Sequence, residues 1–121
     1  MLFIGGKDLD SRIQTITGLF AVNRRAGALW ALAEEPGAAH IVGRSRDLAV
    51  IFFEDLLSLR LSETGTLKAL AENTGFLGDP KSKSFRPMSE GPAPNYPTSW
   101  LPSARVARAW LAMLTEQPFE R

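Results

Sequence analysis

Proline is concentrated in the last third of this chain, which limits the secondary structure available there. Six of the eight prolines lie between Gly78 and Pro102. Each proline lacks a backbone N–H and fixes φ, so we expect this segment to be irregular, neither helix nor central strand. Large side chains nevertheless occur within it, so we expect it to pack on the rest of the chain or against a partner. They are Phe85, Met88, Tyr96 and Trp100.

Residues 1–77 are predicted to form a helical body. Apolar residues recur at helical spacing from Ile13 to Leu32, and glycines at 18 and 27 would bend or split that helix. Pro36 cannot continue a helix and ends it. Before it, Met1–Ile4 is an apolar run ended by two glycines, which suits a short strand or a tucked-in terminus.

Residues 45–61 carry the clearest helical pattern. Ser45 would cap the helix, and an apolar stripe runs from Leu48 to Leu59. The β-branched and aromatic run within 48–53 also suits a buried strand, but the length of the stripe favours the helix. A short helix is predicted from Thr66, with Gly75 as its left-handed C-terminal residue.

The last element is a predicted helix over 103–117, with Ser103 as its cap. The expected fold is therefore mainly α: three to five helices around one core, in a single domain over 1–121. That domain comprises the helical body, the packed proline-rich loop at 78–102 and this final helix. The alternative is an α+β fold in which Met1–Ile4 pairs with His40–Gly43 or with 48–53.

Composition excludes several classes of site. Lys and Arg number 14 against 13 Asp and Glu, so the chain lacks the large net positive charge that would attract nucleic acid or a membrane surface. There is no Cys and only one His, which rules out thiolate zinc sites and His pairs. We expect no metal and no cofactor. The apolar runs are too short for a membrane span, and the N-terminus lacks the pattern of a signal peptide, so the expected location is the cytoplasm without membrane binding.

The residues that suit catalysis are few. His40, in a predicted loop, is the only histidine and therefore the one side chain suited to act as a general base near neutral pH. No nucleophile motif accompanies it. The carboxylate pairs Glu34/Glu35 and Glu54/Asp55 are sequence neighbours, whose side chains diverge on a helix. We therefore expect that the protein is not an enzyme, and keep His40 as the third hypothesis.

Two basic groups suggest anionic ligands. Arg44 and Arg46 flank the predicted helix start at 45, where backbone N–H groups and guanidinium groups would together bind an anion, although an ordinary capped loop is favoured. Residues 66–76 resemble the first helix and turn of a helix-turn-helix. In that alternative the protein is a nucleic-acid-associated transcriptional regulator, its motif covers 66–87, and three side chains contact phosphates: Lys81, Lys83 and Arg86.

The favoured function is a non-catalytic protein-binding module of the inhibitor, immunity or adaptor type. Aromatic and arginine side chains are the ones that most often anchor protein interfaces. The expected anchors are Phe85, Tyr96, Trp100 and Trp110, with Arg86, Arg105 and Arg108 at the rim. The alternative is that these aromatics fill the core. A homodimer built on the last helix, through Trp110 and Leu114, is also considered.

Overall fold

The computed structural model describes residues 1–120 as an α+β fold of three α-helices and two small sheets, so the mainly helical prediction is wrong. In chain order the elements are β1 (Leu2–Gly5), α1 (Asp10–Arg25), β2 (Leu32–Glu35), α2 (Ser45–Arg60), the 3₁₀ turn η1 (Glu72–Thr74), β3 (Phe76–Asp79), β4 (Ser84–Pro87), the 3₁₀ turn η2 (Met88–Glu90), β5 (Ser99–Leu101) and α3 (Ala104–Leu114).

The first sheet is a parallel pair joined through a helix. β1 and β2 align from Leu2 opposite Leu32 to Gly5 opposite Glu35, with α1 as the connection. The helix predicted to continue to Leu32 ends at Arg25, because the chain turns at Gly27, whose φ of 89° favours glycine. The strand at the N-terminus is present. Its partner is β2, neither 40–43 nor the helical 48–53 that the alternative fold required.

The second sheet is antiparallel, in the order β4-β3-β5. Its strands include residues 78–79, 84–87 and 99–101 of the segment predicted to be irregular, so the prediction is wrong for these residues. The prolines permit it because they fall at strand ends: Pro80 follows β3, Pro87 ends the edge strand β4, and Pro102 follows β5. The central strand contains no proline, and its N–H groups therefore remain available for pairing.

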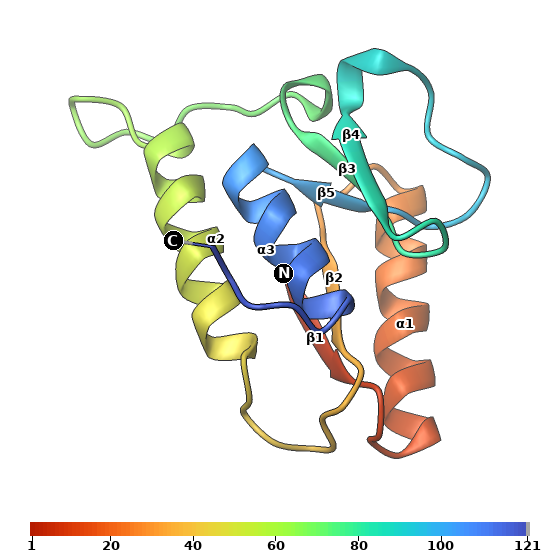
Figure 1. Ribbon diagram of the computed structural model, residues 1–121. Coiled ribbons are helices and arrows are strands. Elements are labelled where there is room, and N and C mark those ends of the chain that lie inside the picture. Colours follow the sequence, from red (N-terminus) through yellow and green to blue (C-terminus); the bar gives the residue numbers. More distant parts are fainter. Residues whose placement is uncertain (121) are drawn as a thin grey trace.

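The helices lie on both sides of the parallel pair (Figure 1). α1 contacts β1 from one side, α3 packs against β2 and β3, and α2 packs on α3. The core centres on α3, whose N-terminus is capped by Ser103 as predicted. The largest fully buried side chains are Trp100, Trp110, Leu48, Leu101, Met113 and Val106.

Two of the local predictions for 45–75 fail. α2 forms as a helix, but the N–H of Arg44 at its start is bonded to Glu35 and the Ser45 side chain does not cap it. Residues 61–71 form no helix. Gly75 is buried with an extended backbone, and a Cβ at this position would overlap the indole of Trp100, so close packing explains this glycine.

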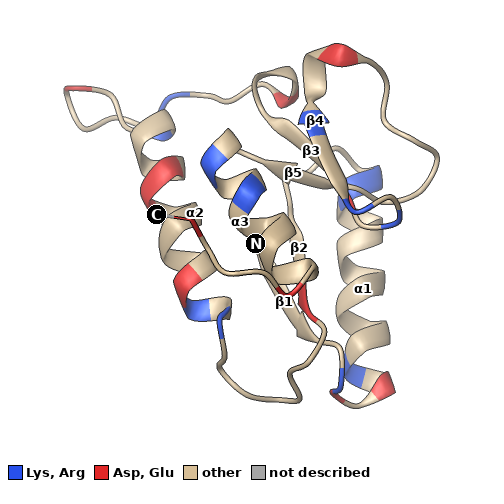
Figure 2. Cartoon of the chain, in the orientation of Figure 1, with Lys and Arg blue, Asp and Glu red and all other residues tan. Residues whose placement is uncertain are grey.

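Residues of both charges are dispersed along the helices and loops of the chain (Figure 2). Among residues 1–120, no helix combines the length and apolar character needed to cross a membrane.

Candidate functional site

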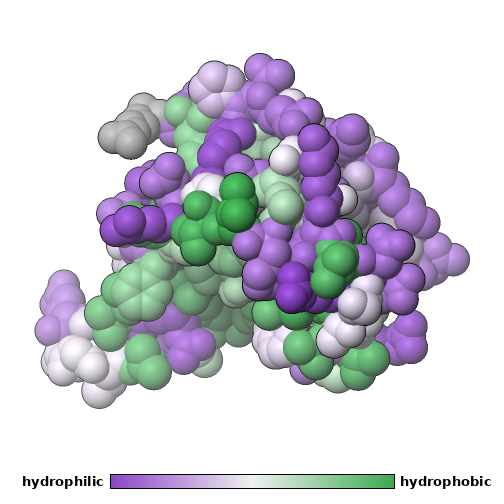
Figure 3. Space-filling model, turned by 90° about the horizontal axis from the view of Figure 1, so that it is seen from below, coloured by the Kyte–Doolittle hydropathy of each residue, from purple (hydrophilic) through white to green (hydrophobic). Residues whose placement is uncertain are grey.

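A cleft of about 630 Å³ lies at the carboxyl ends of β1 and β2, between the start of α1 and the loop that leads to α2. The carboxyl ends of parallel strands are where α/β proteins commonly bind ligands. Much of the wall is apolar, formed by Phe3, Ile4, Ile13, Ile16, Ile41 and Val42. Seen from this end, the surface carries exposed apolar side chains among hydrophilic ones (Figure 3).

Backbone contacts hold the two loops of the cleft together. The N–H of Lys7 donates to the carbonyl of Ala38 at 2.9 Å, and the N–H of Gly6 donates to the carbonyl of Glu35 at 2.9 Å. A Cβ at Gly5 would strike the carbonyl oxygens of Ala38 and Ala39. Glycine at this position therefore allows the loop after β2 to approach the end of β1.

Asp8 is the most fully engaged polar group of the cleft, with a side chain only 10% exposed. Its Oδ1 accepts hydrogen bonds from the N–H of Leu9 at 2.7 Å and from Arg12 Nη1 at 3.1 Å. Its Oδ2 lies 2.8 Å from Nδ1 of His40. Partial desolvation acts to raise the pKa of Asp8, but the bonds from His40, Leu9 and Arg12 outweigh it, so this pKa lies below its ordinary value.

The ionised Asp8 determines how His40 presents its ring. A carboxylate only accepts hydrogen bonds, so the neutral ring carries its proton on Nδ1 and leaves Nε2 as an acceptor. His40 lines the cleft with its side chain 70% exposed. In residues 1–120 no hydrogen bond joins Nε2 to the chain, and none joins the ring to Ser11 or Ser45, which also line the cleft. The arrangement provides a base without a serine nucleophile attached to it.

The sequence identified His40 but not its partner. Asp8, 32 positions before His40, is not among the site residues predicted from the sequence. A signal existed in principle, because two parallel strands bring the loops that follow them to one edge. That signal required β2 to be recognised as a strand.

The predicted anion site is not assembled. Arg44 uses its guanidinium group on the chain itself, stacking 4.1 Å from the centre of the Phe119 ring and donating to the carbonyl of Gln117. Its N–H donates to both carboxylate oxygens of Glu35, at 3.2 and 3.1 Å. Arg46 is exposed beside it. These contacts fix the start of α2 to the loop of the cleft. Of the two arginines predicted to bind an anion, only Arg46 is exposed at the helix start.

The two tryptophans predicted as interface anchors lie in the core. Trp100 is 1% exposed and Trp110 is 2% exposed, and their indole N–H groups donate to the carbonyls of Glu72 and Leu32. Because β5 and α3 bury them, they have no surface to offer a partner. Leu114 is buried too, so the homodimer proposed through Trp110 and Leu114 is not supported by this fold.

The other two predicted anchors, Phe85 and Tyr96, and the predicted rim residue Arg86 make contacts within the proline-rich segment or with β3. Phe85 is half-buried against Phe76, with ring centres 6.2 Å apart. Arg86 donates to the carbonyls of Gly91 at 3.1 Å and Pro92. Tyr96 donates to Asp79 Oδ2 at 2.5 Å. Their polar groups are thereby occupied by the chain.

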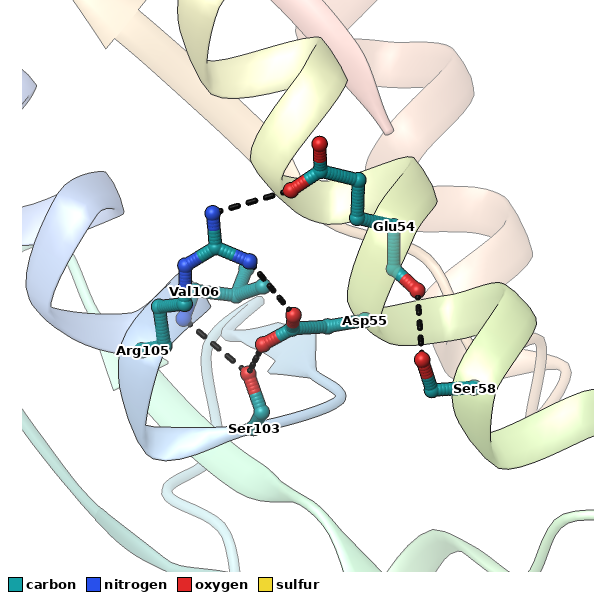
Figure 4. A network of polar contacts seen from close by, with 6 residues as sticks. All are labelled: Glu54, Asp55, Ser58, Ser103, Arg105 and Val106. Atoms are coloured by element: carbon teal, nitrogen blue, oxygen red, sulfur yellow. Dashed lines mark hydrogen bonds and ion pairs between the residues drawn. The ribbon is translucent and has the colours of Figure 1, made fainter. Parts of the chain in front are cut away.

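Arg105 links α3 to α2 (Figure 4). Its guanidinium group donates to Asp55 at 2.8 Å and to Glu54 at 2.9 Å, and the Ser103 hydroxyl donates to the other Asp55 oxygen at 2.5 Å. The adjacent carboxylates thus share one arginine rather than forming a purely solvated face. Arg108, one turn further along α3, is exposed.

The helix-turn-helix prediction is wrong. Residues 66–87 contain the 3₁₀ turn η1 and the β3-β4 hairpin, with no α-helix in this range to enter a groove. Lys81 and Lys83 are exposed near the hairpin turn, and Lys81 Nζ lies 4.0 Å from the centre of the Tyr96 ring. Arg86, the third predicted phosphate contact, is bound to carbonyls as described above.

A second surface feature lies on α2 and the loop that follows it. Val50 and Phe53 on the helix are 51% and 61% exposed, and Leu61 and Leu67 in the loop are 43% and 66% exposed. Val50 and Phe53 lie outside the apolar stripe predicted from the sequence, which runs through Leu48, Ile51, Phe52, Leu56 and Leu59, and Leu48 is the only buried residue of α2.

No group of His, Asp and Glu side chains suited to holding a metal ion occurs within residues 1–120. No family model, curated protein or solved structure matches the chain.

Proposed function

We propose that the protein binds a small organic ligand in the cleft at the ends of β1 and β2. The observation that carries this proposal is the pairing of apolar walls with one oriented hydrogen-bonding group. Ile13 and Ile16 offer surface to the apolar body of a ligand, and His40, held by Asp8, offers Nε2 to its polar group. Ligand sites in proteins typically combine such walls with a few convergent polar groups.

The charges around the cleft select the polar group of the ligand. Two carboxylates, Asp8 and Glu35, and one guanidinium group, from Arg12, belong to the lining. These three side chains together carry one net negative charge. A neutral polar head group, such as an amide or an ester, is therefore favoured over a carboxylate or phosphate.

The test uses hexanamide, which has a neutral head and a five-carbon apolar chain. Chemical-shift changes in the ¹⁵N-labelled protein are expected at the cleft residues, and hexanoate is expected to bind more weakly. Ile16→Gln should weaken binding of hexanamide, whereas Val22→Gln should not. Val22 is on the same helix but is 64% exposed and outside the cleft. Equal effects of the two variants, or shifts scattered away from the cleft, would contradict the proposal.

A second candidate is the protein-binding function expected from the sequence, moved to another surface. The exposed apolar side chains of α2 and its following loop support it, since apolar side chains clustered on a surface often mark an interface. Phe53 is the largest of them. A protein co-purifying at stoichiometric amounts from host lysate should be lost with Phe53→Ser and retained with Thr17→Ser, an exposed position on α1. Retention of that protein by both variants would count against this surface.

A further inference from the structure

We propose that the cleft hydrolyses esters of short apolar acids, with His40 as the general base and Asp8 as the residue that positions it. The inference rests on the ligand-binding function proposed above. It adds a reaction, a substrate class and a role for each polar side chain of the cleft.

The base is the first requirement, and His40 meets it. Its Nδ1 is held by Asp8 Oδ2 at 2.8 Å, and Asp8 is itself fixed by the N–H of Leu9 and by Arg12. This is how a carboxylate orients an imidazole in many acid–base sites, fixing the tautomer and stabilising the imidazolium that forms. His40 is among the residues that line the cleft, and within residues 1–120 its Nε2 makes no hydrogen bond to the chain, so this nitrogen can accept a proton.

Water is the nucleophile that fits this geometry. Neither Ser11 nor Ser45 is hydrogen-bonded to the His40 ring in residues 1–120, so neither hydroxyl is activated by it. In the proposed step, Nε2 removes a proton from a water molecule while the oxygen of that water attacks the ester carbonyl carbon. The bond from that carbon to the alkoxy oxygen then breaks, and the proton on His40 passes to the leaving alkoxide. Ester and water become acid and alcohol, with no acyl-enzyme.

Arg12 supplies charge for the developing oxyanion. One of its terminal nitrogens, Nη1, is bonded to Asp8 at 3.1 Å. Its remaining N–H groups make no hydrogen bond to the chain within residues 1–120, and its side chain is 49% exposed in the cleft lining. Donors placed at the carbonyl oxygen lower the barrier of acyl transfer.

The walls select the acyl group. Ile13 and Ile16 on α1, together with Ile41 and Val42 in the loop before α2, are among the apolar residues that line the cleft. An unbranched acyl chain of about six carbons gains contact with these side chains that an acetyl group does not. Additional methylene groups in an apolar pocket typically improve kcat/KM by about tenfold or more.

The experiment measures hydrolysis of p-nitrophenyl hexanoate, with N-acetylhistidine as the reference for unassisted imidazole catalysis. We expect saturation kinetics, a kcat/KM at least about tenfold above that for the acetate ester, and a loss of about 100-fold in His40→Gln. Asp8→Asn should lower kcat by about tenfold and leave KM unchanged, because it positions the base without touching the substrate. Glu63→Gln, a matched loss of an exposed carboxylate outside the cleft, should change neither.

The outcomes separate this inference from the function on which it rests. Hexanamide binding in the cleft without hydrolysis above the N-acetylhistidine rate overturns the reaction and leaves the ligand site standing. If neither hexanamide binding nor hydrolysis is found, the ligand site and the reaction are both overturned. A burst of p-nitrophenol equal to the protein concentration would reveal an acyl-enzyme and overturn the direct attack of water.

Discussion

The Nδ1 atom of His40 lies 2.8 Å from Oδ2 of Asp8, a residue 32 positions earlier in the chain. The contact joins the loop after β1 to the loop after β2, which meet because the two strands run parallel. It converts the only histidine of the sequence into an oriented group at the polar end of a cleft. The proposed ligand site and the proposed hydrolysis both depend on it.

The tautomer of His40 is the first prediction. The ionised Asp8 can only accept a hydrogen bond, so the neutral ring should carry its proton on Nδ1 and donate a hydrogen bond from there to Asp8 Oδ2. The ¹⁵N chemical shifts of the imidazole read this directly, without assignment ambiguity, because the chain has one histidine. Asp8→Asn should return the ring to the mixture of tautomers found in free histidine. A ring protonated on Nε2 in the wild type would contradict the contact.

Acid should remove the stabilisation that Asp8 provides. Its folded-state pKa is lowered, so the contribution is complete above the ordinary value of 3.8 and is lost as pH falls through the folded value. The difference in unfolding free energy between wild type and Asp8→Asn should therefore shrink as the pH falls below about 3.8. Chemical denaturation at a series of pH values measures the difference. A difference that stays the same or widens below that pH would contradict the contacts of Asp8.

Alkali should act on Tyr96. The hydrogen bond to Asp79 is the largest cause that raises the pKa of Tyr96 above the ordinary 10.0, followed by desolvation and the nearby negative charge. The stabilisation is complete below that ordinary value and is lost as pH rises through the folded one. Tyr96 is the only tyrosine, so ultraviolet titration follows it alone. Asp79→Asn should move the transition to lower pH, and a transition unchanged by that substitution would count against the bond.

Arg24 should matter more for stability than its neighbour Arg25. Its side chain is 7% exposed and donates to the carbonyls of Thr98 and Ala28 and to Glu72, at 2.8, 2.7 and 3.0 Å. Arg24→Met removes all three donors, and we expect a loss of about 2–4 kcal/mol of unfolding free energy. Arg25 is exposed, and Arg25→Met should change stability by less than about 0.5 kcal/mol. Equal losses in the two variants would contradict the assigned role.

Sequence patterns located the helices better than the strands. α2 and α3 each carry an apolar stripe over at least three turns, which a local pattern records. β2 has only four residues. Its first residue, Leu32, lies three positions after Leu29, a spacing that fits a helix equally well. Its pairing with β1 is a tertiary contact that propensity does not contain. Because residues 32–35 were not predicted to be a strand, the cleft could not be predicted either. The pairing of this strand with β1 is what brings His40 to Asp8.

The prolines misled for a related reason. A proline removes only one hydrogen-bond donor from a sheet, its own missing N–H. Strands of three or four residues therefore fit between the prolines or end at one of them. The aromatics of this segment were correctly expected to pack. Trp100 nevertheless lies fully in the core, since β5 is covered by neighbouring elements. Composition cannot distinguish a tryptophan that fills a core from one that anchors an interface, because both roles use the same apolar surface.

The most direct test of the account is the response of His40 to hexanamide. The single imidazole C–H resonance pair should shift on titration and saturate together with the amide signals of the cleft, and Ile16→Gln should weaken both responses while Val22→Gln leaves them unchanged. A His40 signal that stays fixed while hexanamide shifts other parts of the protein would show that the cleft is not the ligand site.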